Sequence, residues 1–299
     1  MITIFGHTGF IGSHLVQHSD RKDLYLPPRY SRRPHSESTD IINFISTIHN
    51  YNIFDNVTLD VETNLLVLCE SLESWRNHCP TAVYTLISSW FVYGGERIRH
   101  NVKETDYCDP HGFYSITKRA AEQLLISYCG TFGLNYRILR LGNVIGPGDN
   151  KVSKQKNAIQ YMVNEMAAGK DVYVYGADNG LMGHFFRDYI HVDDVADAIE
   201  FVLQEGELNT IYNIGNGDVA WPFIYILTYC QEVLAKRGYK PGNIFNMASP
   251  DFHKLVQTES FTMNVDKLNS LGFKTKYIHH QLYDALLDGH DPNLQTVPG

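Results

Sequence analysis

A short β-branched strand followed at once by three evenly spaced glycines constrains this chain more than any other stretch. Residues 2–5 are Ile-Thr-Ile-Phe, which suits a strand buried in a parallel sheet. Gly6, Gly9 and Gly12 come next, and the residues after them are typical of a helix start. Glycines let the backbone turn tightly and approach a pyrophosphate, and the free N–H groups and positive dipole end of a helix attract it. The stretch therefore predicts a strand, turn and helix that bind a dinucleotide.

The segment after the second predicted strand bears on the choice of dinucleotide. That strand is expected at residues 24–26, and Arg29, Arg32 and Arg33 follow it without an acidic residue. An acid here would accept hydrogen bonds from the adenosine ribose of NAD, whereas arginine accommodates the 2′-phosphate of NADP. Arg29 and Arg32 therefore favour NADP, with NAD as the alternative. A solvent-exposed basic loop that binds no ligand would explain the same arginines.

The first half of the predicted sheet is shorter than usual. A buried strand is expected at residues 40–46, where a doubly wound half would normally insert one more strand and helix. A helix is expected at 60–69 and another strand at 82–87. That strand ends in Ser88 and Ser89. At the carboxyl end of a central strand the Ser89 hydroxyl can hold a substrate oxygen, whereas Ser88 is better explained as a strand cap.

Tyr114 and Lys118 stand four residues apart at the start of a predicted helix, so their side chains lie on one helix face. A phenol is a poor acid or base at neutral pH. A nearby ammonium group favours the phenolate and lowers the pKa of the tyrosine, which makes it a usable proton shuttle. Such pairs occur by chance on many exposed helices. The position of this pair after the glycine turn and Ser89 favours proton exchange with a sugar hydroxyl while hydride moves at the same carbon.

The second half of the chain supplies candidate substrate contacts. A strand is expected at residues 136–141, followed by a turn-rich crossing at 142–150 where a second lobe could begin. A helix is expected at 157–168 and a strand at 171–176. Arg187 is a candidate clamp for a diphosphate, because a guanidinium group matches two phosphate oxygens at once.

Two acids follow Arg187 at the start of another predicted helix. Asp193 and Asp194 suit this position because carboxylates are stabilised at the positive end of a helix dipole. They are expected to cap the helix rather than to bind a metal, since nothing nearby in the sequence completes a set of ligands. No metal is therefore predicted.

Composition excludes several classes of protein. The 299 residues, 43% hydrophobic and 19% charged, are typical of a soluble chain with one large domain, or a dinucleotide domain and a smaller lobe. A net charge of −8 argues against a nucleic-acid binder. No long apolar run predicts a membrane span, and we expect no signal peptide because the chain starts directly with a strand. The five scattered cysteines favour reduced thiols in the cytoplasm.

Five motifs together resemble the extended short-chain dehydrogenase/reductase family, specifically its nucleotide-sugar epimerase/dehydratase branch, from residue 1 to about residue 217. They are GxxGxxG at 6–12, Ser-Ser-x-x-Val-Tyr-Gly at 88–94, YxxxK at 114–118, Arg-x-x-Asn-Val-x-Gly-Pro at 140–147 and Arg-Asp-Tyr-Ile-His-Val-Asp-Asp-Val at 187–195. The resemblance implies an α/β fold: a Rossmann-type doubly wound parallel sheet, its N-terminal half shortened here, with a small C-terminal substrate lobe.

The same resemblance implies two functional parts along the chain, one for the cofactor and one for the substrate. Residues 1–150 are expected to be mainly the NAD(P)-binding domain, and residues 151–299 mainly the substrate-binding lobe, with some segments returning to the Rossmann sheet. It also implies a homodimer packed through the helix that carries Tyr114.

Site residues are expected within these motifs and in the segments between them. Ser89, Tyr114 and Lys118 are expected to be catalytic. Cofactor contacts are expected at Gly6, Thr8, Gly9, Phe10, Ile11, Gly12, Arg29, Arg32, Phe44, Ile45, Ser46, Tyr114, Lys118 and Val144. A nucleotide-sugar substrate is expected to contact Ser89, Trp90, Asn143, Asn157, Tyr175 and Arg187.

Departures from the family pattern narrow the reaction. The 4,6-dehydratases carry Asp-Glu where this chain has Trp90 and Phe91, which argues against dehydration. GDP-fucose synthase needs Cys and His where this chain has Phe91 and Gly148, which argues against the combined epimerase-reductase reaction. Hydride transfer at one sugar carbon, expected to be carbon 4, remains. A 4-ketoreductase using NADP is preferred, a 4-epimerase with tightly held NAD is the alternative, and a non-catalytic dinucleotide-binding module is a distant third.

Overall fold

The computed structural model describes residues 1–95, 98–149, 152–153, 156–176, 183–217, 220–256 and 259–290. Six strands, all paired in parallel, form the central sheet in the spatial order β10-β6-β4-β3-β1-β2. Their bounds are Ile2–Phe5 (β1), Leu24–Tyr25 (β2), Asp40–Asn43 (β3), Val83–Ser89 (β4), Tyr136–Leu141 (β6) and Thr210–Ile214 (β10). The predicted α/β fold with a parallel sheet is confirmed.

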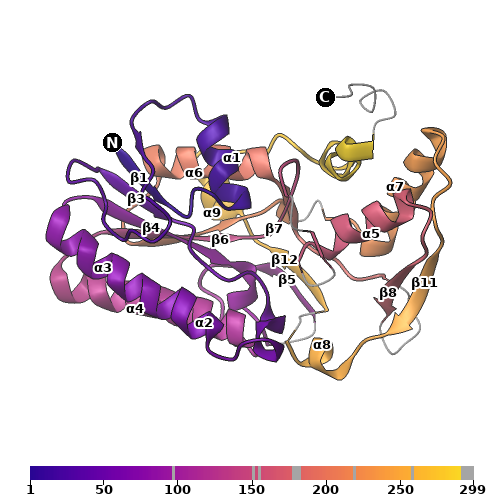
Figure 1. Cartoon of the computed structure of the whole chain (residues 1–299), viewed down its shortest axis with the longest axis horizontal. Helices are drawn as coiled ribbons and strands as arrows, with labels where there is room; N and C mark the ends of the chain where they lie inside the picture. Colours follow the sequence, from indigo (N-terminus) through magenta and orange to yellow (C-terminus); the bar gives the residue numbers. More distant parts are fainter. Residues whose placement is uncertain are drawn as a thin grey trace.

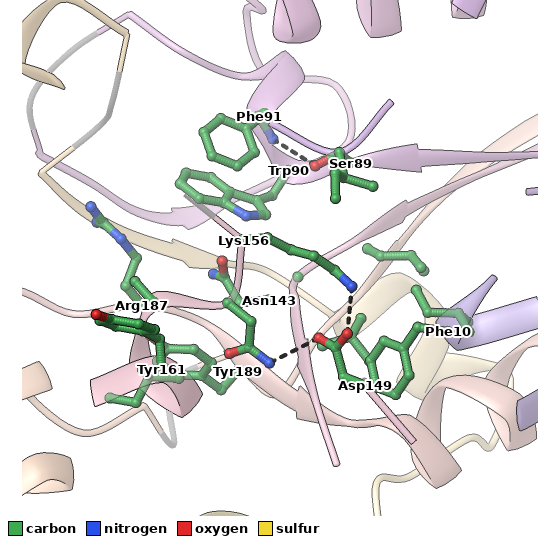
Figure 2. A pocket seen from close by; sticks show the side chains of 18 of the residues that line it. Phe10, Ser89, Trp90, Phe91, Asn143, Asp149, Lys156, Tyr161, Arg187 and Tyr189 are labelled. Carbon is green, nitrogen blue, oxygen red and sulfur yellow. Dashed lines mark hydrogen bonds and ion pairs between the residues drawn. The ribbon is translucent and has the colours of Figure 1, made fainter. Parts of the chain in front are cut away.

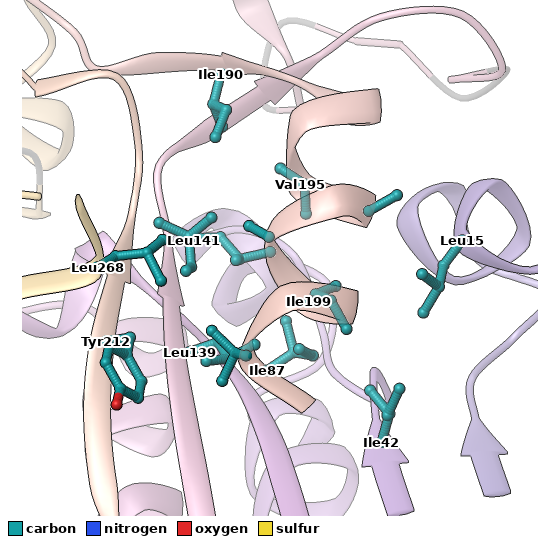
Figure 3. Close-up of a cluster of buried hydrophobic side chains, with 14 of the residues drawn as sticks. Leu15, Ile42, Ile87, Leu139, Leu141, Ile190, Val195, Ile199, Tyr212 and Leu268 are labelled. Atoms are coloured by element: carbon teal, nitrogen blue, oxygen red, sulfur yellow. The ribbon is translucent and has the colours of Figure 1, made fainter. Parts of the chain in front are cut away.

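Helices cover both faces of the sheet (Figure 1). On one face α1 (Phe10–His18) packs against α6 (Val192–Glu205). Their apolar sides meet strand residues in a buried cluster that includes Leu15, Ile42 and Ile199 (Figure 3). Full burial of one such side chain contributes roughly 1.5–3 kcal/mol, so this layer fixes α1 firmly to the sheet.

The opposite face is covered by α3 (Val67–His78) and α4 (Phe113–Phe132). Trp75 of α3 and Leu125 of α4 are buried there against strand residues. Neighbouring strand residues face opposite sides: Ile42 belongs to the first cluster and Ile41 to the second. This alternation is the period of two expected for a strand buried on both faces.

The shortened N-terminal half is present as predicted. Residues 26–39 contain neither helix nor strand, and β2 is therefore the edge of the sheet. The chain runs from β2 back across β1 to β3, so the strand order reverses at β1. In open parallel sheets, ligands bind at the carboxyl ends of the strands beside such a reversal.

A smaller lobe follows the sheet, on the right of Figure 1. It contains α5 (Ala158–Ala167), β8 (Val172–Gly176), α7 (Phe223–Lys236), β11 (Ile244–Ala248) and α8 (Asp251–Val256). β8 pairs with β11, and α5 and α7 share a hydrophobic cluster of their own. Two further strand pairs connect the two parts: β5 (Ile98–Val102) pairs with β12 (Ser260–Met263), and β7 (Asn143–Ile145) pairs with β9 (Tyr189–His191). Short helices α9 (Asp266–Ser270) and α10 (His280–Asp284) follow.

Two element boundaries differ from the sequence expectation. The helix expected at 60–69 is part of a longer helical stretch made of α2 (Leu59–Val61), a π-helical segment (Glu62–Leu66) and α3. Sequence analysis missed the end of α3, because the polar residues on its outer face interrupt the apolar helical pattern. The strand expected at 40–46 ends at Asn43, because the Asn43 side chain accepts a hydrogen bond from the Ile45 N–H and turns the chain.

Two composition-based expectations can be compared with the fold. Within the described ranges, the helices are too short or too polar for any of them to cross a bilayer. The five cysteines are unpaired, and Cys79, Cys129 and Cys230 are buried, as expected for small core hydrophobes.

The glycine turn allows a stability test with a matched control. A methyl group on Gly12 would lie 2.6 Å from the Gly6 carbonyl oxygen, whereas one on Gly130, within α4, would meet nothing within 4 Å. We expect Gly12→Ala to lower the free energy of unfolding by about 1–3 kcal/mol through overpacking. Gly130→Ala should raise it by about 0.5–1 kcal/mol, because alanine favours the helix. Denaturant unfolding measures both, and a stabilised Gly12→Ala variant would contradict the tight turn.

Candidate active site

A cavity of about 910 Å³ opens at the carboxyl ends of β1, β3, β4 and β6 and extends to the smaller lobe. Most residues predicted for the site line it. From the cofactor set these are Gly6, Thr8, Gly9, Phe10, Ile11, Gly12, Phe44, Ser46, Tyr114, Lys118 and Val144. From the substrate set they are Ser89, Trp90, Asn143, Asn157, Tyr175 and Arg187. The fold thus brings together residues that are up to 181 positions apart.

The glycine turn forms one end of the cavity and suits a bound pyrophosphate. Gly6 has φ of +76°, which favours glycine, and Gly12 packs directly over the Gly6 carbonyl. Gly9 caps α1 without a side chain, and no acidic residue occupies the first turn of the helix. The N–H groups at this helix end therefore face the cavity without a competing carboxylate. The backbone leaves a cradle that any larger side chain at Gly12 would fill. Dinucleotide binding requires such a cradle, because the pyrophosphate must approach the backbone closely.

Three predicted cofactor residues do not line the cavity: Arg29, Arg32 and Ile45. Arg29 is exposed, and its guanidinium lies 5.9 Å from the ring centre of Tyr30. Arg32 donates to the backbone carbonyls of Arg29 and Ser31 and lies 3.7 Å from the carboxylate of Glu70. Ile45 instead packs against the hydrophobic cluster under α3 and α4. Neither arginine that suggested NADP therefore lines the cavity in which a cofactor would bind.

Tyr114 and Lys118 are brought to the cavity by the first turns of α4. Both side chains are buried, with residue exposures of 7% and 3%. The Lys118 Nζ donates to the backbone carbonyl of Ile87 at 2.5 Å, which fixes the ammonium beside β4. Ser89 ends β4, and its hydroxyl oxygen accepts from the Phe91 N–H at 3.3 Å, as Figure 2 shows. Ser89 therefore caps a short helical turn and still faces Tyr114.

Burial decides the protonation of both groups. It raises the pKa of Tyr114 to about 12, although an interaction with Ser89 opposes the shift. It lowers the pKa of Lys118 to about 8, although the carboxylate of Glu122 opposes that shift. The expectation that Lys118 lowers the pKa of Tyr114 is therefore not met in this structure, because the loss of water around the phenol outweighs the opposing hydrogen bond with Ser89.

Glu122 anchors the helix that carries both residues. Its carboxylate is fully buried and accepts two hydrogen bonds from Arg140 of β6, at 2.8 and 2.9 Å. Ser88 of β4 donates to it at 2.6 Å, and Arg119 donates at 2.8 Å. Ser88 thus links the sheet to α4, a more specific role than the strand cap that sequence analysis favoured.

Aromatic rings form part of the cavity wall beside Tyr114. Trp90 and Phe91 stack with ring centres 4.2 Å apart, and the edge of Phe91 meets Tyr114 at 5.8 Å. Arg187 lies over Trp90, with its guanidinium carbon 5.6 Å from the ring centre. Burial lowers the pKa of Arg187 to about 10, so the group remains a cation at neutral pH. The cavity therefore has an apolar centre with a partly buried positive charge at its far end.

Sequence reasoning missed an ion pair in this cavity. Lys156 contacts the buried carboxylate of Asp149, and Asn157 donates to the same carboxylate at 3.3 Å (Figure 2). Asn157 also caps α5 by accepting from the Gln160 N–H. The neighbouring Asn143 donates to the Asp188 carbonyl at 3.1 Å. The position of Lys156 directly before Asn157 was the available signal.

A second missed group closes the cavity near Tyr175. The His253 ring lies 4.7 Å from the Tyr175 ring, and the Tyr51 hydroxyl lies 3.0 Å from His253 Nδ1. Burial lowers the pKa of His253 to about 4, and the charge of Arg187 acts in the same direction. His253 is therefore neutral near pH 7. Nothing local to residues 251–256 indicated this role, because α8 reaches the cavity only through the fold of the lobe.

The chain belongs to the NAD dependent epimerase/dehydratase family, whose family model matches residues 39–215. Membership agrees with the resemblance found in the motifs. The family is one of NAD-dependent epimerases and dehydratases.

Individual relatives span several reactions within that class. The chain is 29% identical over 285 residues to a dTDP-D-glucose 4,6-dehydratase of Dictyostelium discoideum, covering 75% of this chain and 62% of the relative. The chain thus spans less than two thirds of that protein. Its fold is similar to a UDP-glucose 4-epimerase of Thermotoga maritima solved with UDP-glucose, with a TM-score of 0.81, 18% identity and coverage of 98% and 99%. It is also similar to RMD of Pseudomonas aeruginosa solved with NADPH, with a TM-score of 0.76, 19% identity and coverage of 96% and 98%.

Burial of Lys118 predicts a characteristic pH dependence of stability. Between pH 8 and the usual lysine pKa of 10.5, the folded chain has released the Lys118 proton while the unfolded chain keeps it. The contribution of Lys118 to the free energy of unfolding should therefore rise with pH through this window. Lys118→Met should remove that rise and stabilise the protein at pH 7 by about 3 kcal/mol.

Denaturant unfolding from pH 7 to 10 measures this effect. Lys170 provides the control, because its side chain is 63% exposed beside Glu165. Lys170→Met should leave the pH profile unchanged. A Lys118→Met variant less stable than the parent at pH 7 would show that burial of the ammonium does not lower the free energy of unfolding.

Proposed function

We propose that the protein is an NAD(P)-dependent oxidoreductase acting on a nucleotide-diphosphate sugar, and that it reduces a 4-keto sugar by hydride transfer at carbon 4. The observation that carries the proposal is the convergence of Ser89, Tyr114 and Lys118 in one cavity between the glycine turn and Arg187. In this proposal residues 1–150 mainly bind the cofactor and residues 151–299 mainly bind the substrate.

The chain's own residues would handle the oxygen of the reacting carbon. The Ser89 hydroxyl would hold the carbonyl oxygen against the Tyr114 hydroxyl, which would give its proton to that oxygen as the alcohol forms. The Lys118 ammonium would stabilise the phenolate left behind, an interaction that grows as the phenol loses its proton. A bound NADPH or NADH, held by the glycine turn, would supply the hydride to the same carbon.

Two rings support simple hydride transfer over elimination of water. Trp90 and Phe91 occupy the positions after Ser89, and neither side chain can act as an acid or a base near neutral pH. Elimination needs an acid and a base beside the leaving hydroxyl. The stacked rings instead offer an apolar surface to one face of a sugar and exclude water from the reacting carbon.

The far end of the cavity supports recognition of a diphosphate. Arg187 places a partly buried cation there, and its planar guanidinium suits two phosphate oxygens at once. Asn143 and Asn157 line the same cavity as Arg187 and offer amide groups for further polar contacts. Tyr175 and neutral His253 add flat surfaces beside Arg187 that suit a nucleoside.

A 4-epimerase with tightly held NAD is the second candidate, and one observation favours it. Arg29 and Arg32, which suggested NADP, lie outside the cavity, and Arg32 is engaged by Glu70. The same Tyr114 would then first accept the proton of the sugar hydroxyl and later return it. The two candidates differ in the cofactor that the purified protein retains.

Replacement of the phenol tests whether the site turns over. Tyr114→Phe removes the proton donor and keeps the ring, so we expect loss of at least about 10²-fold in turnover with NADPH or NADH affinity nearly unchanged. Reduction of 4-keto nucleotide sugars, followed by NADPH absorbance, measures the first quantity. Fluorescence titration measures the second. A function that survives Tyr114→Phe would favour the non-catalytic binding module.

Cofactor analysis of the parent protein separates the two enzyme candidates. Mass spectrometry of nucleotide released from the purified protein should find little NAD, and titration should favour NADPH over NADH. NAD that co-purifies tightly, with turnover of a nucleotide sugar and no net oxidation, would instead establish the epimerase.

We also propose that the protein is a homodimer packed through α4, working in the reducing cytoplasm. Four apolar side chains on α4 are between 37% and 46% exposed: Phe113, Ile116, Leu124 and Phe132. Leu66, at the end of the neighbouring π-helical segment, is 56% exposed. Apolar groups gathered on the outer face of two adjacent helices are typical of a surface covered by a second subunit.

Charges placed on this surface should separate the subunits. The double variant Ile116→Asp, Leu124→Asp should shift the mass in sedimentation equilibrium from dimer to monomer, because each carboxylate would be buried without a partner. Leu208 is 45% exposed on the loop before β10 and provides the control. Leu208→Asp should remain a dimer, and a parent protein that sediments as a monomer would refute the interface.

A further inference from the structure

The packing of α1 against α6 brings together three side chains with metal-binding atoms. His14 and His18 lie one turn apart on α1 and face Asp193 at the start of α6. One potential ligand atom from each lies within 4.8 Å of the others. The cluster is separate from the active site, since none of the three residues lines the cavity. We propose that His14, His18 and Asp193 form a binding site for Zn²⁺.

Individual contacts show how the three groups converge. The His14 Nε2 is 2.6 Å from Asp193 Oδ1, and the His18 Nδ1 is 3.8 Å from the same oxygen. The two imidazole rings lie nearly parallel, with ring centres 5.7 Å apart. A tetrahedral zinc ion with bonds of about 2.0–2.1 Å holds its ligand atoms about 3.4 Å apart. Small side-chain rotations on two rigid helices would bring the three atoms to that spacing.

Outer contacts already orient two of the ligands. The other ring nitrogen of His18, Nε2, is 3.0 Å from Asp197 Oδ1, one turn further along α6. This pairing assigns the proton to Nε2 and leaves Nδ1 with a lone pair toward Asp193. The Tyr277 hydroxyl donates to Asp193 Oδ2 at 2.8 Å, which leaves Oδ1 toward the histidines. A carboxylate behind a ligand histidine is the usual second layer of zinc sites.

The charge and exposure of the surroundings suit a divalent cation. His14, His18 and Asp193 have side-chain exposures of 16%, 32% and 22%, so an ion and a water molecule can reach them. Lys276 is the nearby cation, and it is paired with Asp197 Oδ2 at 2.6 Å rather than with Asp193. His191 is not a fourth ligand, because its Nδ1 accepts from the Asp193 N–H and its ring stacks on Tyr277.

The choice of metal follows from the donor set. Two imidazoles and one carboxylate, with an open fourth position for water, match zinc sites in proteins. Ca²⁺ and Mg²⁺ prefer sites made of oxygen atoms, and the cluster contains no thiolate that would favour softer metals. Sequence analysis found no ligand set around Asp193, because His14 lies 179 positions earlier in the chain, and His18 lies on the same distant helix.

Zinc binding to the full chain, treated first with a chelator and dialysed, tests the proposal. We expect one Zn²⁺ per chain in competition with a chromophoric chelator, and an upward shift of the thermal unfolding midpoint, because the ion would join α1 to α6. Co²⁺ should give the intense visible absorption of a four-coordinate ion, without the charge-transfer bands of a thiolate ligand. Such bands would indicate exposed Cys69 and would overturn the proposal.

Three variants locate the site. His18→Gln removes a ligand on a partly exposed position and should abolish the stoichiometric Zn²⁺ binding and the thermal shift. His111→Gln is the matched control, because His111 also lies beside a carboxylate, Asp109, at 3.2 Å but has no second histidine. Asp197→Asn should keep the stoichiometry and weaken the affinity by about tenfold or more, as a positioning residue does.

The outcomes decide between the alternatives. Stoichiometric binding that persists in His18→Gln, or a parent protein that fails to compete for Zn²⁺, would refute the site. If His18→Gln does not fold, as judged by circular dichroism, Asp197→Asn and the Co²⁺ spectrum of the parent protein carry the test. None of these measurements depends on turnover, so they stand or fall separately from the proposed function.

Discussion

The buried carboxylate of Glu122 is the interaction on which the arrangement of the active site depends. Removing a carboxylate from water costs several kcal/mol unless hydrogen bonds replace its hydration. Here Arg140 from β6, Ser88 from β4 and Arg119 from α4 supply them. Because two of these donors come from adjacent central strands, α4 has one satisfactory orientation on the sheet. Tyr114 and Lys118 lie two turns and one turn from Glu122, so their positions at the cavity follow from it.

The site itself is held in an electrostatically unfavourable state. Lys118 is buried with a lowered pKa and Tyr114 with a raised one, so both side chains have lost water that the unfolded chain would keep. The rest of the fold offsets this cost through the two hydrophobic layers that hold α1, α4 and α6 to the sheet. The same burial strengthens any interaction between Tyr114, Lys118 and a bound sugar, because little water screens it. Under the proposed function, stability and activity would thus be opposed at these two positions.

Much of the fold could be predicted because it depends on local patterns. The β-branched runs at β1, β4 and β6 and the three glycines each determine their own backbone, and the structure contains all of them near their expected bounds. Most predicted site residues line the cavity for the same reason, since motifs at strand ends converge at one edge of a parallel sheet. Arg29 and Arg32 do not, because the residues beyond a two-residue edge strand have no pattern that fixes their direction. Ile45 does not, because its side chain packs against the hydrophobic cluster under α3 and α4.

The sequence by itself determined the turn at Gly6–Gly12, the shared helix face of Tyr114 and Lys118, and the absence of acids at Trp90 and Phe91. These properties depend on residue type and short spacing alone. Tertiary structure decided the direction of the Tyr114 pKa shift, the pairing of Lys156 with Asp149, and the meeting of His14 and His18 with Asp193. Each of these depends on how much water is excluded and which distant segments are neighbours. The exclusion of water and the choice of neighbours are both set by how the strands and helices pack, which no local sequence pattern indicates.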